Sequence, residues 1–366
     1  MTDKSQKAIE NMFKVNLGIK KTDQVLIFTD GLNSGIKTTG KRIYNTGKKY
    51  TDHVQYIKSN PTGCHGTEPP EDLWEAAFGS HTVNELKKYK LLQPLLLKKI
   101  GEKKLTDVEN IIKSNKKDAV TAVIALSYYS TSHTRFRDML NRICGARYAS
   151  MPLFDEKMLS GAMTVDWKNM HERTKDMARI VNRYERIDID CPNGTAISFS
   201  IQGRKALADT GIITKPGQFS NLPAGEVYLA PLEGTAHGQL VLDWAPTRKL
   251  KSPVTAYVEK GMVRKLDGKE PYVKVLEDKL NEKKENRNIA ELGIGTNDKA
   301  KRPDNILESE KILGTIHIAF GANSSFGGKV STSFHQDYVF FDPTVTLISK
   351  KGNKRVLLQK GRLHLK

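Results

Sequence analysis

Two short, uninterrupted apolar runs constrain the fold of the first half more than any other feature. They lie in residues 23–31 (DQVLIFTDG) and 119–127 (AVTAVIALS), and segments with helical periodicity surround both. A strand that is apolar at every residue is buried on both faces, which is typical of a parallel sheet covered by helices. Strands of this kind alternating with helices predict an α/β domain with a mainly parallel sheet. We expect its helices at the N-terminus and at residues 34–50, 72–90, 91–115 and 170–187.

The sequence pattern changes near residue 185. From residue 186 onward, polar and apolar residues alternate, and Pro192-Asn193-Gly194 is typical of a hairpin turn. Helical periodicity returns only at 271–286 and near 306–313. The second half is therefore predicted to be an α+β domain that is rich in β-strands. Because a single core rarely grows beyond about 250–300 residues, a chain of 366 residues is expected to form two domains, 1–185 and 186–366.

Charge and composition exclude several classes of protein. The net charge of +18 is dispersed along the chain, mostly in lysine doublets, and no basic run is interleaved with aromatic residues as in a nucleic-acid stacking platform. We therefore expect no nucleic-acid partner. No apolar stretch reaches the roughly 18 residues of a membrane span, and the N-terminus lacks the apolar core of a signal peptide. The three cysteines have no paired spacing. These features predict a cytoplasmic protein without a membrane partner.

Two acidic residues of the second half have unusual surroundings. Glu226 follows the turn residues Pro223 and Gly225 in NLPAGEVYLAP, so it stands at a junction of loop and strand from which a side chain can point into a cleft. Glu291 lies in AELGIGTN, between apolar neighbours and ahead of two glycines. Burying an acid there costs free energy unless it is paired or bound to a metal. Glu291 is therefore the stronger candidate for a functional site.

Two later segments supply histidines. His317 lies within the apolar strand TIHIAFG, and His335 and Asp337 are two residues apart in SFHQDYVF. Side chains two residues apart point to the same face of a strand. A His-x-Asp pair on one strand is a recurrent arrangement of metal ligands.

Taken together, these residues predict a metal site. The five candidates are Glu226, Glu291, His317, His335 and Asp337. They combine carboxylate oxygens and imidazole nitrogens without a thiolate, a ligand set that suits zinc, cobalt, manganese or iron. A catalytic zinc ion usually has three protein ligands, so five favour two divalent ions that share a bridging carboxylate, about 3.5–4 Å apart.

The segments NLPAGEV, ELGIGTN, GTIHIAFG and HQD resemble those of the thermophilic-type metalloaminopeptidases, the aminopeptidase T-like enzymes. The resemblance extends from about residue 20 to residue 350 and is weaker in the first half. It implies an N-terminal α/β domain ahead of a catalytic domain with two divalent metal ions, Zn, Co or Mn. By this resemblance the five candidates are the metal ligands. Glu291 also transfers the proton of the attacking water, and Glu310 lies two residues from the expected position of a further family glutamate.

The resemblance also implies a homodimer whose cavity admits short peptides, with residues 1–185 forming the cavity and the dimer contacts. The predicted activity is the hydrolysis of N-terminal residues from short peptides by a hydroxide that two metal ions activate.

One position departs from the pattern of the peptidases. They have a tyrosine seven residues after the equivalent of His317, where it stabilises the oxyanion, but this sequence has Ser324. A serine is too short to replace a phenol, and loss of an oxyanion donor typically costs about 3–4 kcal/mol. Tyr338 is an alternative donor, although it points away from Asp337 on a strand. The substitution counts against peptidase activity and leaves the metal ligands intact.

Two other functions use the same residues. An Fe(II) site of two histidines and one carboxylate activates dioxygen. Here His335 and Asp337 would be joined by His237 or His317. A ring-cleaving 2,5-dihydroxypyridine dioxygenase is similar to the aminopeptidases in overall pattern and also lacks the peptidase tyrosine, although Glu226 and Glu291 would then have no obvious role. A non-catalytic relative that binds metal or peptide is the third alternative.

Overall fold

The computed structural model describes residues 3–32 and 34–365, and the chain forms two compact units. Unit 1 comprises Met1–Thr164 and Gly211–Pro223, and unit 2 comprises Val165–Thr210 and Ala224–Lys366. The chain thus passes from one unit to the other at several points, rather than once near residue 185. The segment 211–223 returns to unit 1 because it contains a strand of that unit's sheet. The helix predicted at 170–187 belongs to unit 2, where it packs against two strands.

Unit 1 contains a five-stranded sheet, sheet A, in which every pairing is parallel. Its order is β2-β1-β3-β4-β8, with β1 Val25–Thr29, β2 Val54–Lys58, β3 Ala122–Leu126, β4 Arg147–Ser150 and β8 Phe219–Asn221. Each residue of β1 and β3 is buried, as the two apolar runs predict. Helix α2 (Ser34–Gly47) packs against β1 and β2.

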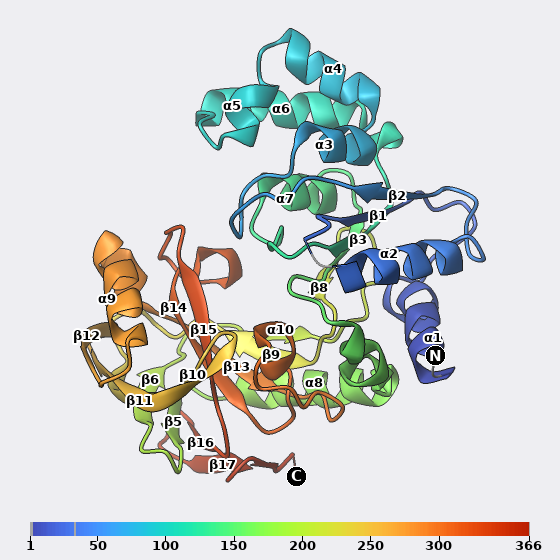
Figure 1. Ribbon diagram of the computed structural model, residues 1–366. Coiled ribbons are helices and arrows are strands. Elements are labelled where there is room, and N and C mark those ends of the chain that lie inside the picture. The colour runs from blue at the N-terminus through green and yellow to red at the C-terminus, as the bar shows by residue number, and fades with distance from the viewer. Residues whose placement is uncertain (1–2, 33, 366) are drawn as a thin grey trace. The chain divides into compact units, whose positions relative to one another are not determined.

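The remaining helices of unit 1 are shorter than the sequence pattern predicts. They are α1 Asp3–Asn11 with its π-helical extension Met12–Asn16, α3 Glu71–Phe78, α4 Ser80–Lys88, α5 Leu92–Leu96, α6 Glu102–Ser114 and α7 Arg135–Arg142, with short 3₁₀ turns at Lys116–Asp118, Glu156–Ser160 and Ala162–Thr164. The helix expected at 72–90 breaks at Gly79, whose φ is +87°. The one expected at 91–115 breaks near Lys98, with a φ of +54°. A left-handed residue cannot continue an α-helix, so the segment forms the cluster of short helices α3–α6 in Figure 1.

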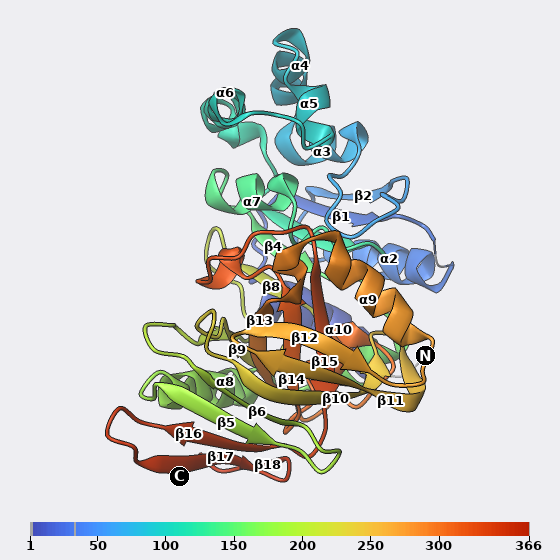
Figure 2. The ribbon, with the colours of Figure 1, turned by 90° about the vertical axis from the view of Figure 1, so that its left-hand side faces the viewer.

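Unit 2 contains two antiparallel sheets. Sheet B has the order β12-β11-β10-β6-β5-β16-β17-β18, and sheet C has the order β15-β14-β13-β9-β7. Figure 2 shows β5, β16 and β17 of sheet B side by side. The strands of sheet B are β5 Arg186–Asp190, β6 Ala196–Ser200, β10 His237–Ala245, β11 Arg248–Glu259, β12 Met262–Asp267, β16 Thr344–Ile348, β17 Lys354–Gln359 and β18 Arg362–Leu363. Those of sheet C are β7 Leu207–Asp209, β9 Glu226–Leu229, β13 Ile289–Gly295, β14 Ile316–Gly321 and β15 His335–Phe340.

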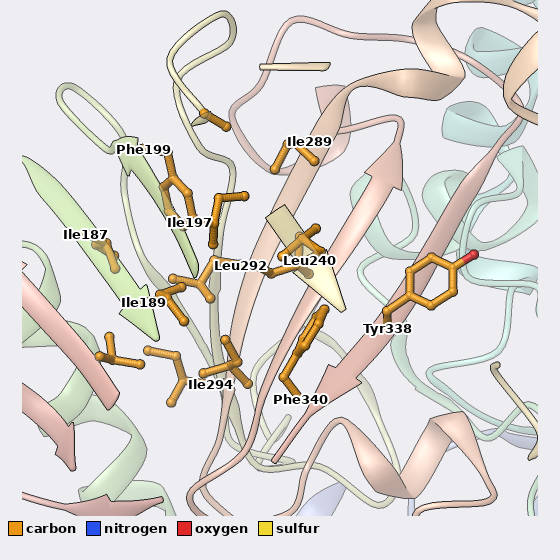
Figure 3. Close-up of a cluster of buried hydrophobic side chains, with 14 of the residues drawn as sticks. Ile187, Ile189, Ile197, Phe199, Leu240, Ile289, Leu292, Ile294, Tyr338 and Phe340 are labelled. Atoms are coloured by element: carbon orange, nitrogen blue, oxygen red, sulfur yellow. The ribbon is translucent and has the colours of Figure 1, made fainter. Parts of the chain in front are cut away.

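Sheets B and C enclose the core of unit 2 (Figure 3). Ile187, Ile197 and Leu240 of sheet B face Leu292 and Ile294 of sheet C across this core. Unit 2 is completed by α8 Trp167–Val181, α9 Tyr272–Glu282, α10 Ile306–Ser309 and the 3₁₀ turns Lys284–Arg287 and Ser324–Phe326. Because Leu292 and Ile294 of β13 point into this core, Glu291, Gly293 and Gly295 face the opposite side of sheet C.

The predicted fold class is confirmed: a parallel sheet with helices in the N-terminal part and β-rich antiparallel sheets in the C-terminal part. Among residues 3–32 and 34–365, no helix has both the length and the apolar character that crossing a membrane requires.

Candidate metal centre

The face of sheet C that points away from the core brings all five predicted ligands together. They come from four neighbouring strands: Glu226 of β9, Glu291 of β13, His317 of β14, and His335 and Asp337 of β15. Ala319 of β14 pairs with both Glu291 and Asp337, so these two acids flank it on the same face. The sheet register therefore gathers side chains that are more than a hundred residues apart in the sequence.

Carboxylate oxygens surround the two imidazole nitrogens at an unusual distance. The Nε2 atom of His317 lies 3.4 Å from Glu226 Oε2 and 3.5 Å from Glu291 Oε1. The Nε2 atom of His335 lies 3.3 Å from Glu291 Oε2 and 3.6 Å from Asp337 Oδ2. These separations exceed the 2.7–3.2 Å of ordinary N–H···O hydrogen bonds. Two ligands that each lie about 2.1 Å from one ion are roughly 3.0–3.4 Å apart, depending on the angle between them.

Buried polar atoms at this face lack hydrogen-bond partners. Within the described part of the chain, Glu226 Oε2, Asp337 Oδ1 and His317 Nδ1 are buried without one. Buried polar groups are rarely left unsatisfied, so unpartnered carboxylate oxygens at this face favour a bound cation. The ring of His335 is oriented by a contact of 2.7 Å between its Nδ1 and the carbonyl oxygen of Ala322, which leaves Nε2 as the ligating nitrogen.

The donor set fits a divalent transition metal. Ligand atoms of Glu291, His317 and Asp337 all lie within 4.8 Å of one another. Together with His335 they offer two imidazoles and two carboxylates, which suit iron, manganese, cobalt or zinc. The geometry therefore supports a metal centre, while the identity and number of the ions are open to proposal.

The charges at the site shift the pKa values of His317 and Glu291 in opposite directions. Burial alone would lower the pKa of His317, but the facing oxygen of Glu291 and the other nearby carboxylates outweigh burial and raise the pKa to about 9. Burial raises the pKa of Glu291, yet the facing nitrogens of His317 and His335 bring it below the usual value. Without a metal ion, protons on the imidazoles thus neutralise the buried carboxylates. A bound cation would take over this role and displace those protons.

Two glycines of β13 make room for the site. A Cβ atom on Gly293 would lie 1.9 Å from Cε1 of His317, so the imidazole lies directly over this glycine. A Cβ atom on Gly295 would lie 2.0 Å from the carbonyl oxygen of Ile312, because the chain after α10 crosses the sheet there. The two glycines that follow Glu291 thus permit other groups to approach the backbone of β13 closely.

Lys311 is a member of the site that the sequence did not reveal. Its side chain is almost completely buried, and its Nζ lies 2.7 Å from Glu226 Oε1 and 3.0 Å from Glu310 Oε2. Burial would lower the pKa of Lys311, but the charges of Glu226, Glu310 and Asp209 outweigh that effect and raise it. The side chain is therefore an ammonium ion. Glu310, predicted as a possible ligand, contacts this lysine.

Tyr228 is a second residue that the sequence analysis missed. It pairs with Gly293 in the sheet, so its side chain lies on the same face as Glu226 and His317. Its ring meets Phe326 edge to face, with the centroids 5.8 Å apart, and Phe326 meets the ring of His335 at 5.9 Å. The two-residue alternation of Glu226 and Tyr228 was the available signal.

Two other candidates, His237 and Tyr338, lie away from this cluster. His237 is exposed at the start of β10 in sheet B, whereas His317 lies with Asp337 and Glu291 in the group of possible ligands. Of the two histidines proposed to join His335 and Asp337, the structure therefore favours His317. Tyr338 points into the core, where its hydroxyl contacts that of Tyr272 at 2.9 Å (Figure 3). Ser324 begins an exposed 3₁₀ turn. The proposed replacement of the peptidase tyrosine by Tyr338 therefore fails, because its hydroxyl lies on the opposite side of the sheet.

Solved structures of other proteins share the fold, and two of them match this chain over almost its full length. The structure of 2,5-dihydroxypyridine dioxygenase from Pseudomonas putida KT2440 has a TM-score of 0.72 and 16% identity, and the match covers 100% of this chain and 98% of that one. Wild-type AmpT from Thermus thermophilus has a TM-score of 0.58 and 14% identity, with 98% of each chain covered. The predicted relationship to the aminopeptidase T-like enzymes thus holds at the level of the fold.

The family match agrees with the dioxygenase alternative that the sequence left open. No curated protein matches the sequence significantly. The family described as NicX, 2,5-dihydroxypyridine 5,6-dioxygenase, matches residues 82–363, well over half of the chain. The match includes every residue of the metal centre described above. Enzymes of two classes thus share this fold, and by sequence the chain belongs to the NicX family.

Proposed function

We propose that this protein is an Fe(II)-dependent dioxygenase that cleaves a dihydroxylated, nitrogen-containing aromatic ring. The observation that carries the proposal is the pair of imidazoles on either side of one carboxylate. His317 Nε2 and His335 Nε2 lie 3.5 and 3.3 Å from the two oxygens of Glu291. Two histidines and a carboxylate are the ligand set of non-haem Fe(II) oxygenases, and membership of the NicX family supports the same reaction.

The residues of the centre have separate roles in this proposal. His317, His335, Glu291 and Asp337 would hold the ion. A ferrous ion in such a set supplies the one-electron chemistry that allows dioxygen to react with a ring. The edge-to-face pair of Tyr228 and Phe326 provides aromatic surface next to His335, where a planar substrate ring can pack.

A second candidate is the aminopeptidase predicted from the sequence. The observation in its favour is Glu226, whose Oε2 lies 3.4 Å from His317 Nε2. With Glu226 included, the ligands form two groups that share Glu291, as a pair of bridged ions requires. The exposed Ser324 counts against this candidate, because it leaves the hydrolase without its expected oxyanion donor.

The two functions are distinguished by one pair of assays. Anaerobically prepared apoprotein is loaded with Fe(II), and oxygen uptake is followed with 2,5-dihydroxypyridine. Protein loaded with zinc, cobalt or manganese is tested on aminoacyl p-nitroanilides. We expect substrate-dependent uptake of one O₂ per ring cleaved and no release of nitroaniline.

Two variants link the oxygen uptake to the centre. His317→Gln removes a ligand and is expected to abolish oxygen uptake. His237→Gln is the matched control, since His237 is exposed in sheet B, and it should behave as the wild type. Peptide hydrolysis without oxygen uptake would refute the dioxygenase.

A further inference from the structure

A buried ammonium ion lies beside the metal centre. Lys311 directly follows Glu310 at the end of α10, and only 1% of its surface is exposed. Lysine is almost never fully buried unless it is paired. Its Nζ contacts Glu226 at 2.7 Å and Glu310 at 3.0 Å, so two carboxylates from different parts of unit 2 converge on it.

The backbone around Lys311 fixes the position of its side chain. The backbone amide of Asn297 donates to the carbonyl oxygen of Lys311 at 2.8 Å. The backbone amide of Lys311 in turn donates to the carbonyl oxygen of Glu308 at 3.0 Å. The next residue, Ile312, bridges to Asn297 in parallel orientation. Its carbonyl oxygen lies where a Cβ on residue 295 would be, and only glycine leaves that space. The ammonium is therefore held against β13, next to the ligands.

Glu226 is the residue for which this position matters. Its Oε2 faces His317 Nε2 at 3.4 Å, and its Oε1 faces Lys311 Nζ at 2.7 Å. In a two-ion centre, Glu226 and His317 would be ligands of the ion that shares Glu291 with its neighbour. A divalent ion bound to Glu226 would lie close to the ammonium on the same carboxylate, and like charges repel strongly in a buried site.

We propose that Lys311 takes the place of a second metal ion, so that the centre holds one divalent ion at Glu291, His317, His335 and Asp337. The ammonium balances the charge of Glu226 and also contacts Glu310, and both acids would otherwise be buried without a partner. In this arrangement Glu226 holds the ammonium of Lys311. A site of two histidines and one carboxylate would by itself leave the presence of Glu226 unexplained. This inference rests on the proposed function for the identity of the ion, but not for the number of ions.

The test is the number of ions bound per chain. Apoprotein is loaded with Fe(II) without oxygen, and in parallel with Mn(II), then freed of unbound metal and analysed by mass spectrometry of the elements. We expect one ion per wild-type chain. In Lys311→Met, which keeps the length of the side chain and removes its charge, we expect two. Lys311→Arg retains the charge and should bind one.

Lys301→Met is the matched control, because Lys301 is exposed on the loop before α10, and it should also bind one ion. If Lys311→Met does not fold, Lys311→Gln provides the same measurement, since its amide can still donate to Glu226 but carries no charge. Two ions in the wild type, or one ion in the folded uncharged variant, would overturn the proposal. A wild type that binds one ion but consumes no oxygen with the pyridine supports the role of Lys311 and refutes the dioxygenase, so the two failures are distinguishable.

Discussion

Replacing Gly293 with alanine should disable the metal centre through a single methyl group. Gly293 of β13 pairs with His317 of β14, and both face the site. A Cβ at this position would lie 1.9 Å from Cε1 and 2.0 Å from Nε2 of the imidazole. Since non-bonded carbon atoms are about 3.5 Å apart at contact, the ring must move by roughly 1.5 Å or the strands must separate.

The size of this displacement sets the expected effect. Metal–ligand distances are held within about 0.2 Å, so a ring displaced by roughly 1.5 Å no longer binds the ion. Loss of an outer-shell partner alone lowers metal affinity by about 10–100-fold, and we expect at least ~100-fold for the loss of His317. Overpacking a core costs about 1–3 kcal/mol, which lowers the Tm of a unit of this size by roughly 2–12 °C.

Titration calorimetry with Mn(II) and a thermal scan of the apoprotein measure the two effects. Gly101→Ala is the matched control, because a Cβ there meets no atom within 4 Å and φ is −76°. The control should bind metal like the wild type. If Gly293→Ala retained wild-type affinity, His317 would not be a ligand in the position that the structure gives it.

Three further predictions concern single groups. Glu291→Gln keeps the shape of the side chain but removes the charge that both histidines face, so metal affinity measured by calorimetry should fall by at least ~100-fold. The pKa of His317 is raised from 6.5 to about 9, so its contribution to apoprotein stability is complete below pH 6.5 and is lost as the pH rises through 9. Thermal scans with a chelator should therefore show a falling Tm over this range, and a smaller fall with metal bound. Glu68→Gln replaces the carboxylate that accepts hydrogen bonds from the backbone amides of Arg135 and Phe136 at the start of α7. This change should lower the free energy of unfolding of unit 1 by about 1 kcal/mol in urea. An unchanged free energy would contradict the capping role.

The fold was predictable where the sequence pattern reflects burial directly. β1 and β3 were found because all of their residues except Thr29 are apolar, and both are buried throughout. The break at Gly79 was missed because hydrophobic periodicity continues across it, whereas the backbone there is left-handed. The division of the chain into two units also could not be predicted from the local hydrophobic pattern. Strand β8 joins sheet A through pairing with β4, a contact about seventy residues away in the chain.

The candidate site was predictable to the extent that its residues follow strand alternation. His335 and Asp337 were recognised together because two-residue spacing places both on one face. Lys311 gave no such signal: in ESEKIL it resembles a lysine on an exposed helix surface, and only the crossing over Gly295 buries it. The sequence pattern cannot identify a residue that reaches its site only through tertiary packing. This holds even when the residue is adjacent to a predicted candidate such as Glu310.

Lys311 also offers a physical reason why one fold can serve two chemistries. A two-ion hydrolase needs its second metal ion to activate water. A metal ion with an open coordination position binds a water molecule and lowers the pKa of that water. An ammonium supplies the same sign of charge to Glu226, but its three protons only donate hydrogen bonds and it has no open coordination position. Exchanging an ion for Lys311 would therefore remove the hydrolytic nucleophile while still supplying positive charge to the buried carboxylates. The proposed oxygen chemistry at His317, His335, Glu291 and Asp337 would require one metal ion, so it would lose nothing by the exchange. On this reasoning the number of metal ions, rather than the identity of the ligands, would separate a hydrolase from a dioxygenase on this fold.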